Sequence, residues 1–304
     1  MSNGTPHFRY RFLMGAMPLN QLTGTVRLMC IPEDIDRLPQ ISQAWRGASA
    51  RMVELANEEA GEPDDIAVED PPAAVRDRLA EIEADPLFKA SFSATPTSFK
   101  VVEIDKLVAP QRDVNLDYVA SLQARIPGTS IDELVEFCVG ARAAPPDLKM
   151  LQTAQNQMTF SSLSLDLRFL GGFPKPIGED DISVAHSGGQ PVEAVVLLIG
   201  FGAAPINAYA VGPRLVLSNG FHRIVALRSA NISKVPMVIQ HVANPEIEFP
   251  DHYLGLSRAY LLQQARPVLV KDFFDAALTV ELRLKPRRKT LRVAWVSEDG
   301  IGPE

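Results

Sequence analysis

The sequence predicts an α/β (α+β) fold in which helices flank a small mixed sheet. Within residues 214–239, a short apolar run at Leu215–Leu217 is typical of a buried strand, and Ser218-Asn219-Gly220 is typical of a turn. A helical pattern from Phe221 to Ala230 follows, and Val235–Ile239 is a second strand-like run. The chain has 304 residues, 46% of them hydrophobic and 22% charged, so it can bury the core of one large domain or two small ones.

Composition limits the classes of protein to which the chain can belong. A net charge of −7 and a pI near 5.4 argue against non-specific binding to nucleic acid, although they leave room for a local basic patch. The two cysteines, Cys30 and Cys138, lie in apolar surroundings, which indicates buried, reduced thiols. No stretch approaches the ~18 apolar residues of a membrane span. We therefore expect a cytoplasmic protein without a membrane partner.

Residues 1–95 are predicted to form an N-terminal elaboration that packs on the core. Their pattern indicates short strands at Tyr10–Met14 and Gly24–Met29, and a helix that opens at Pro32 with acidic residues in its first turn. Two further helices are predicted at Ser42–Ala60 and Ala73–Ala84, on either side of an acidic loop.

Residues 96–245 are predicted to form the core. Its opening strand starts near Val101, includes Glu103, and is followed by the loop Pro110-Gln111-Arg112. Asn115–Gln123 is predicted as the first helix of this core, because its apolar residues fall on one face. The remaining strands are predicted at Pro191–Ile199 and Asn207–Ala210.

An insertion at about 127–190 interrupts this core. Ser130 and Glu133 have the spacing of a capping box at the start of a helix, and Leu163–Leu170 alternates like a strand. Residues 171–176 are predicted to form a rigid loop. A long insertion beside a ligand site is often a lid, and a plain structural extension is an equally good interpretation.

Residues 246–304 are predicted to contain a helix at Tyr253–Gln264 and a β-hairpin made of Leu278–Lys285 and Thr290–Val296. This hairpin would be the most basic element of an acidic chain. Its cationic residues include Arg283, Lys285, Arg287, Arg288 and Lys289. They could contact the phosphates of DNA, or they could protect the edge of the hairpin from aggregation.

The turn before the helix at Phe221 has the features of an anion site. His222 and Arg223 lie in the first helical turn, where the helix dipole disfavours cations by about 0.3–1 kcal/mol each. An anion held by the free N–H groups after Asn219 and Gly220 would remove that cost, and a phosphate is the obvious candidate. The alternative is a neutral His222 hydrogen-bonded to a neighbouring carbonyl and an Arg223 paired with a carboxylate.

The segments 214–239 and 101–112 together resemble the ParB/sulfiredoxin-like fold, or ParB-like nuclease domain superfamily. The resemblance covers roughly residues 98–242: a strand, a Gly turn, a His-Arg pair, an Ala- and Leu-rich helix and a Val-Pro strand, with the Pro-Gln-Arg loop upstream. In members of this superfamily, the two motifs are usually separated by about half as many residues as in this chain. No helix-turn-helix follows the core, and Phe221 occupies the position where the sulfinic acid reductases of this fold need a cysteine.

The resemblance implies that the chain binds a nucleoside triphosphate, ATP or CTP, and that Mg²⁺ accompanies the nucleotide. No residues of the chain are predicted to form a separate metal site. Its phosphates would be bound by Gln111, Arg112, Ser218, Asn219, Gly220 and Phe221. His222 and Arg223 would then act on the developing charge. Glu103 would be a general base if it matches the glutamate of the serine kinases of this fold, whereas a glutamate on an alternating strand is commonly exposed to solvent.

Three functions remain open from the sequence. The first is hydrolysis of a nucleoside triphosphate or transfer of its phosphoryl group. The second is a DNA-associated, nucleotide-gated regulator or a ParB-like nuclease without a helix-turn-helix, and the third is a scaffold that has lost its ligand; any of them could be a homo-oligomer. Glu179-Asp180-Asp181 with His186 is an alternative metal-binding group, although acidic residues in such a loop usually face solvent.

Overall fold

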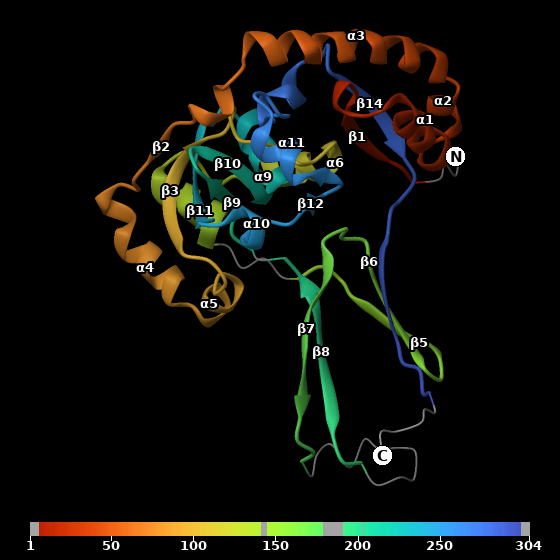
Figure 1. The fold of residues 1–304 in the computed structure, drawn as a ribbon, viewed down its shortest axis with the longest axis vertical. Coiled ribbons are helices and arrows are strands. Elements are labelled where there is room, and N and C mark those ends of the chain that lie inside the picture. The colour runs from red at the N-terminus through yellow and green to blue at the C-terminus, as the bar shows by residue number, and fades with distance from the viewer. Residues whose placement is uncertain (1–5, 141–144, 179–190, 203, 299–304) are drawn as a thin grey trace. The chain divides into compact units, whose positions relative to one another are not determined.

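The computed structural model describes residues 6–140, 145–178, 191–202 and 204–298, and it has a mixed α+β fold with several small sheets (Figure 1). The chain divides into two compact units. Unit 1 consists of residues 1–143 and 203–286, and unit 2 consists of residues 144–202 and 287–304. Among the described helices, none is long and apolar enough to cross a membrane.

A five-stranded mixed sheet lies at the centre of unit 1. Its order is β10-β9-β11-β3-β2; β9 and β11 run parallel, and the other neighbours are antiparallel. The strands are β2 (Val68–Glu69), β3 (Thr97–Glu103), β9 (Asn207–Val211), β10 (Arg214–Asn219) and β11 (Lys234–His241). This confirms the strands predicted around 101, 207, 215 and 235, whose short apolar runs suit a sheet that is covered by other elements.

Helix α9 (Phe221–Ser229) follows β10 directly, as predicted, and packs against α6 (Leu116–Gln123). Five of its nine residues are buried in the main core of unit 1: Phe221, Ile224, Val225, Ala226 and Leu227. Because one side of α9 is held in this core, its first turn has a fixed position at the end of β10.

A second sheet of unit 1 joins segments from both ends of the chain. Its order is β14-β1-β4, with β1 (Phe8–Leu13), β4 (Asp113–Asn115) and β14 (Thr279–Leu284). The predicted hairpin of residues 278–296 is therefore wrong, because β14 pairs with β1 and not with the strand after it. Phe12 of β1 and Leu282 of β14 are buried in one apolar cluster. This shared core, and not closeness along the chain, determines which strand β14 pairs with.

Helices surround the N-terminal part of this sheet. The segment predicted as a strand at 24–29 is instead the end of α1 (Leu19–Met29), in which Leu22 and Val26 are buried at helical spacing. The helices that follow are α2 (Pro32–Ile35), α3 (Leu38–Glu58), α4 (Arg76–Ala84) and α5 (Pro86–Ser91). Short 3₁₀ turns lie at Met14–Ala16 (η1), Glu62–Asp64 (η2) and Ala73–Val75 (η3).

The middle and C-terminal parts of unit 1 contain short elements. Ser130 and Glu133 form the predicted capping box of α7 (Ile131–Val135), which continues into a π-helical turn, η4 (Glu136–Gly140). The predicted helix 253–264 is shorter than expected, because Tyr253 belongs to a tight hairpin that precedes it. The remaining elements are α10 (Pro245–Glu248), β12 (His252–Tyr253), β13 (Leu256–Ser257), α11 (Arg258–Gln263) and η5 (Val270–Phe274).

Unit 2 is made entirely of strands in the described residues. One sheet has the order β15-β6-β5, and β7 pairs with β8 in a two-stranded ribbon. The strands are β5 (Lys149–Ala154), β6 (Gln157–Ser162), β7 (Leu167–Lys175), β8 (Ala194–Phe201) and β15 (Lys289–Ala294). Three expectations are corrected: residues 171–175 continue β7 and are not a loop, β8 does not join the core sheet, and β15 pairs with β6.

Candidate functional site

The turn between β10 and α9 requires glycine. Gly220 has a φ of 94°, a left-handed conformation that other residues rarely adopt. A Cβ atom at this position would lie 2.7 Å from Cγ1 of Ile206. The Gly220 N–H donates to Oδ1 of Asn219 at 2.8 Å, so the asparagine side chain closes the turn. The backbone can therefore begin α9 directly after the strand and leave the first N–H groups of the helix at the end of the sheet.

The loop Pro110-Gln111-Arg112 lies beside this turn, as the sequence predicted. Val108 forms a parallel bridge with Val216, and the Leu217 N–H donates to the Val108 carbonyl at 2.9 Å. Further along, the Asn115 N–H donates to Nε2 of His222 at 3.2 Å. The chain from 108 to 115 therefore follows β10 and the first turn of α9, with Gln111 and Arg112 between these two contacts.

His222 is a neutral group in this setting. Burial lowers the pKa of its imidazole to about 4, and its ring lies edge-on to Tyr118 with 5.3 Å between centroids. Because Nε2 accepts the hydrogen bond from Asn115, the neutral ring carries its proton on Nδ1. His222 can therefore donate a hydrogen bond at neutral pH, but it brings no positive charge. The neutral ring agrees with the alternative considered from the sequence, although its partner is the Asn115 N–H and not a carbonyl.

Arg223 binds backbone carbonyls. Its Nη1 donates to the carbonyls of Phe137 and Cys138 at 3.3 and 3.2 Å, and Nη2 donates to the carbonyl of Ala204. Burial lowers the pKa of its guanidinium and raises the pKa of the neighbouring Cys138 thiol to about 12. Arg223 thus fastens α9 to the end of η4, a role that the spacing of the His-Arg pair did not reveal.

Arg112 is the cation that the structure places beside the turn. Its Nη1 donates to Oε1 of Gln21 at 2.6 Å, and its Nη2 donates to the Gly255 carbonyl at 3.1 Å. Nε of Arg112 and Oε1 of Gln111 are both buried and have no hydrogen-bond partner in the part of the chain that is described. A buried polar atom without a partner costs about 1–3 kcal/mol, so two of them in adjacent residues need an explanation.

Tyr253 also contributes to the site, although the sequence offered no signal for it. Its hydroxyl donates to the Ser218 carbonyl at 2.7 Å and lies 3.3 Å from Oγ of Ser218. The turn at Leu254 and Gly255, both with positive φ, places the Gly255 carbonyl against Arg112. The β12–β13 hairpin therefore holds both the turn and the opposite loop.

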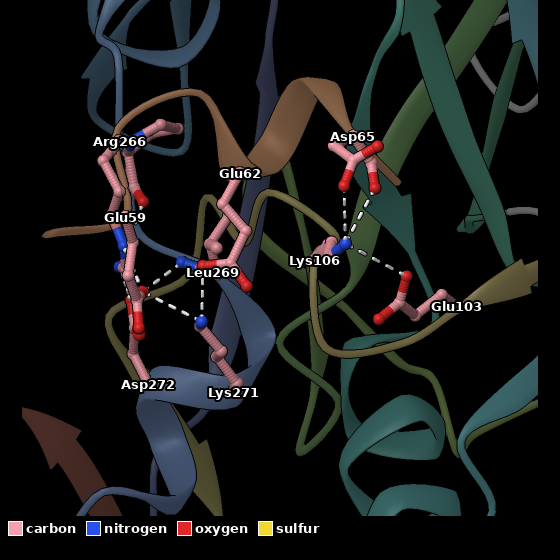
Figure 2. Close-up of polar contacts among 10 residues, drawn as sticks. Glu59, Glu62, Asp65, Glu103, Lys106, Arg266, Leu269, Lys271 and Asp272 are labelled. Carbon is pink, nitrogen blue, oxygen red and sulfur yellow. Dashed lines mark hydrogen bonds and ion pairs between the residues drawn. The ribbon is translucent and has the colours of Figure 1, made fainter. Parts of the chain in front are cut away.

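Glu103 lies away from His222. It pairs in register with Lys234, accepts from the Ala67 N–H at 3.3 Å, and has Nζ of Lys106 at 3.8 Å (Figure 2). Nearby Asp105 binds Arg228 at the C-terminal end of α9. A nine-residue helix spans about 12 Å, so the expected general base and the expected phosphate site are at opposite ends of α9.

The cations at the C-terminus are divided between the two units. In unit 1, Arg283 lies in β14 and Lys285 follows it, and Arg283 binds the buried carboxylate of Asp34 at 3.2 Å. The other three cations, Arg287, Arg288 and Lys289, belong to unit 2. Contact of these cations with DNA remains a prediction. The hairpin on which it was based does not form, because β14 and β15 pair with other strands.

A buried ion cluster lies elsewhere in unit 1 (Figure 2). The Arg266 side chain is fully buried; it binds Asp272 at 2.5 and 2.7 Å and Glu59 at 2.7 Å. Lys271 binds Glu59 at 2.8 Å and Glu62 at 2.5 Å. Burial alone would raise the pKa of Glu59, but the hydrogen bonds from Lys271 and Arg266 outweigh it and lower that pKa to about 2. The charges of this cluster are paired with one another, so the cluster joins the N- and C-terminal segments of unit 1.

No described residues form a group of three or more His, Cys, Asp or Glu side chains that could hold a metal ion. The alternative metal group, Glu179 to Asp181 with His186, lies outside the described residues. Of two hollows, one of about 250 Å³ is lined by residues such as Arg11 and Phe273, and one of about 290 Å³ is lined by Glu59, Arg266 and Lys271 of the ion cluster; neither includes the turn at Gly220.

Comparison with known proteins found no matching family, no matching curated protein and no matching solved structure. The function must therefore be inferred from the geometry of the site.

Proposed function

We propose that this chain is a ParB/sulfiredoxin-like protein that binds the phosphates of a nucleoside triphosphate, with Mg²⁺, at the turn between β10 and α9. The proposal rests on one observation. A glycine turn that opens a helix lies beside a loop whose Arg112 and Gln111 each leave one buried polar atom without a partner in the described residues.

The chemistry of the two unpartnered atoms matches a nucleotide. Nε of Arg112 is a donor and suits a phosphate oxygen, whereas Oε1 of Gln111 is an acceptor and suits a hydroxyl or amino group. Both atoms are covered by protein, so a small movement of the loop would accompany binding. The N–H groups at the start of α9 would hold the phosphate in the favourable field of the helix dipole.

The roles of His222 and Arg223 differ in this proposal. His222 would donate to a phosphate oxygen through Nδ1, since its Nε2 is already bonded to the Asn115 N–H. It cannot accept a proton at Nε2 without losing that bond, so it would stabilise charge and would not act as a base. Arg223 would position α9, because its guanidinium binds the carbonyls of η4. Hydrolysis or phosphoryl transfer would then depend on Arg112 and the Mg²⁺ ion for neutralising charge.

A titration tests the proposal. The purified chain is titrated with ATP, CTP, GTP and ADP, with and without Mg²⁺, and the midpoint of thermal unfolding and the release of phosphate are followed. Binding to the folded state raises that midpoint. We expect a rise with at least one triphosphate, and we expect Arg112→Ala to abolish it.

The matched control is Arg287→Ala, which removes an arginine from unit 2 and should leave the nucleotide response unchanged. Arg223→Ala is unsuitable as a test, because it removes a structural contact. The proposal fails if no nucleotide changes the unfolding of the wild-type chain, or if Arg112→Ala responds as the wild type does.

A further inference from the structure

An aromatic side chain with an open surface lies beside the proposed phosphate site. Tyr118 is on α6, which packs side by side with α9 (Figure 1). Its ring contacts the ring of His222, with 5.3 Å between the centroids and 63° between the planes. Because His222 is in the first turn of α9, the Tyr118 ring lies next to the N–H groups that are expected to hold the phosphates.

Tyr118 is held in this position by one residue that serves both helices. Oδ1 of Asn115 accepts from the Tyr118 N–H at 3.0 Å and so caps α6. The Asn115 N–H donates to Nε2 of His222 at 3.2 Å. Val119 and Leu122 are buried and fix the opposite side of α6 in the core. The place of the ring beside α9 is therefore set before any ligand binds.

The Tyr118 ring is not needed for the core of unit 1. The residue is 50% exposed, and its hydroxyl forms no hydrogen bond with any described residue. The other aromatic rings around the turn are used by the fold. Phe221 is 3% exposed, whereas the Tyr253 ring packs against two further aromatic rings, those of Tyr209 and Phe249. Of these rings, Tyr118 therefore has the most surface left for a ligand.

Two cations near the ring lack an acidic partner in the part of the chain that is described. Arg223 binds the carbonyls of η4 and Ala204 and no carboxylate. Burial lowers the pKa of its guanidinium, and the nearby charge of Arg125 adds to this effect. Arg125 itself forms no ion pair with a described residue. The electrostatic field on this side of α9 therefore favours a ligand that carries negative charge.

We propose that Tyr118 is the platform on which the base of the nucleotide stacks while the first turn of α9 holds its phosphates. This inference rests on the proposed function, and it names the ligand as a nucleotide and not an inorganic polyphosphate or a sugar phosphate. Stacking of a base on an aromatic side chain contributes about tenfold or more to affinity. Every base has a π-face, so the ring selects for the presence of a base and not for its identity.

Calorimetric titration of the full chain with ATP, CTP, GTP and inorganic tripolyphosphate, each with Mg²⁺, tests the proposal. Tripolyphosphate offers the phosphates without the base. We expect the wild type to bind at least one nucleotide about tenfold more tightly than tripolyphosphate. Tyr118→Ala should weaken the binding of that nucleotide about tenfold and leave tripolyphosphate unchanged. Tyr118→Phe should bind the nucleotide as the wild type does, because it keeps the ring.

The matched control is Leu87→Ala, which removes a 63% exposed apolar side chain from α5, outside the site. If tripolyphosphate binds and Tyr118→Ala binds the nucleotide as the wild type does, this inference is overturned and the phosphate site stands. Equal losses for the nucleotide and for tripolyphosphate in Tyr118→Ala would also contradict stacking. If none of the four ligands binds to the wild type, the proposed function is overturned and this inference with it.

A second measurement covers the case in which Tyr118→Ala disturbs α6. The chain is prepared with protonated tyrosine rings in an otherwise deuterated protein, and transfer of magnetisation from these rings to the protons of the bound base is followed by NMR. We expect this transfer in the wild type and its loss in Tyr118→Phe, which keeps the ring but removes its protons from view. Transfer that persists in Tyr118→Phe would come from another of the five tyrosines and would overturn the inference.

Discussion

The two units of this chain differ in whether they bury their apolar residues. Unit 1 contains three clusters of buried apolar residues, which hold both of its larger sheets. In the described part of unit 2, Leu167 is the one apolar residue that is buried. The comparison teaches that apolar content alone does not form a core. Unit 1 has the layers needed to cover its strands, whereas the described strands of unit 2 form small sheets without a covering layer within that unit.

The difference also separates two kinds of site. The turn at Gly220 is held on all sides by hydrogen bonds and by the buried face of α9, so its geometry is fixed before any ligand binds. The β7–β8 ribbon is largely apolar, and its Arg168 is paired with Asp166. We therefore expect a small polar ligand to be recognised by unit 1.

The same substitution in each unit should give the largest contrast. Phe273 is fully buried and packs against Phe221 with 4.8 Å between ring centroids, whereas Phe173 is 47% exposed. Phe273→Ala should lower the free energy of unfolding of unit 1 by about 3–5 kcal/mol, because it leaves a cavity. Phe173→Ala should change the free energy of unfolding by less than about 0.5 kcal/mol. Urea unfolding followed by tryptophan fluorescence measures both, and equal losses would mean that unit 2 has a core of its own.

Two arginines give the next contrast. Arg266→Ala leaves the buried carboxylate of Asp272 without its main partner, which should cost about 3 kcal/mol of unfolding free energy. Arg168 pairs with Asp166 on the surface of unit 2, so Arg168→Ala should cost less than about 1 kcal/mol. The two variants are compared by urea unfolding at one salt concentration. A small loss for Arg266→Ala would show that Asp272 finds another partner.

Two glycines with positive φ give a smaller contrast. Gly220→Ala adds a methyl group that overlaps Ile206 in a left-handed backbone, and it should cost about 2 kcal/mol. Gly171→Ala meets no atom within 4 Å, so the added cost should be limited to about 1 kcal/mol of backbone strain. Thermal unfolding measures the loss in each case. Gly220→Ala should also weaken the nucleotide response, and Gly171→Ala should not.

The smallest effect concerns pH. The pKa of His222 is about 4 in the folded chain and near 6.5 when unfolded, so the folded state resists its protonation. Above pH 6.5 the group is neutral in both states and contributes no pH dependence. As the pH falls from 6.5 towards 4, stability is lost, by about 1.4 kcal/mol at pH 5.5. His222→Gln should remove this part of the pH dependence; an unchanged slope would mean that His222 is not buried in solution.

Local patterns predicted the parts of unit 1 in which neighbours in sequence are neighbours in space. The strand at 214–219, the glycine turn and α9 follow from a short apolar run, a turn dipeptide and helical spacing. The capping box at Ser130 is equally local. By contrast, β14 pairs with β1 across more than 260 residues, and no local signal could distinguish this partner from the strand that begins at Lys289. The prediction of a strand within Leu19–Met29 was wrong, because over so few residues the apolar positions fit the period of a strand as well as that of a helix.

The candidate site was predictable in its outline and not in its details. The closeness of Pro110–Arg112 to the turn was expected from the resemblance between the two motifs and those of a known fold. The hydrogen bond from Asn115 to His222, the carbonyls bound by Arg223 and the contact from Tyr253 depend on tertiary packing. These three contacts decide which groups are neutral, which are structural and which are left to meet a ligand.

The pairing of β1 with β14 has a consequence for synthesis of the chain. Phe8 faces Leu284 in this sheet, so β1 leaves the ribosome long before its partner β14. At about 5–20 residues per second, this interval is roughly 15–60 s. During this time β1 can pair only with β4, and the buried side chains of Tyr10 and Phe12 lack Leu282 and Leu284 of their apolar cluster. The nascent chain should therefore bind a chaperone until residue 284 emerges, and the central sheet, complete at His241, should fold first.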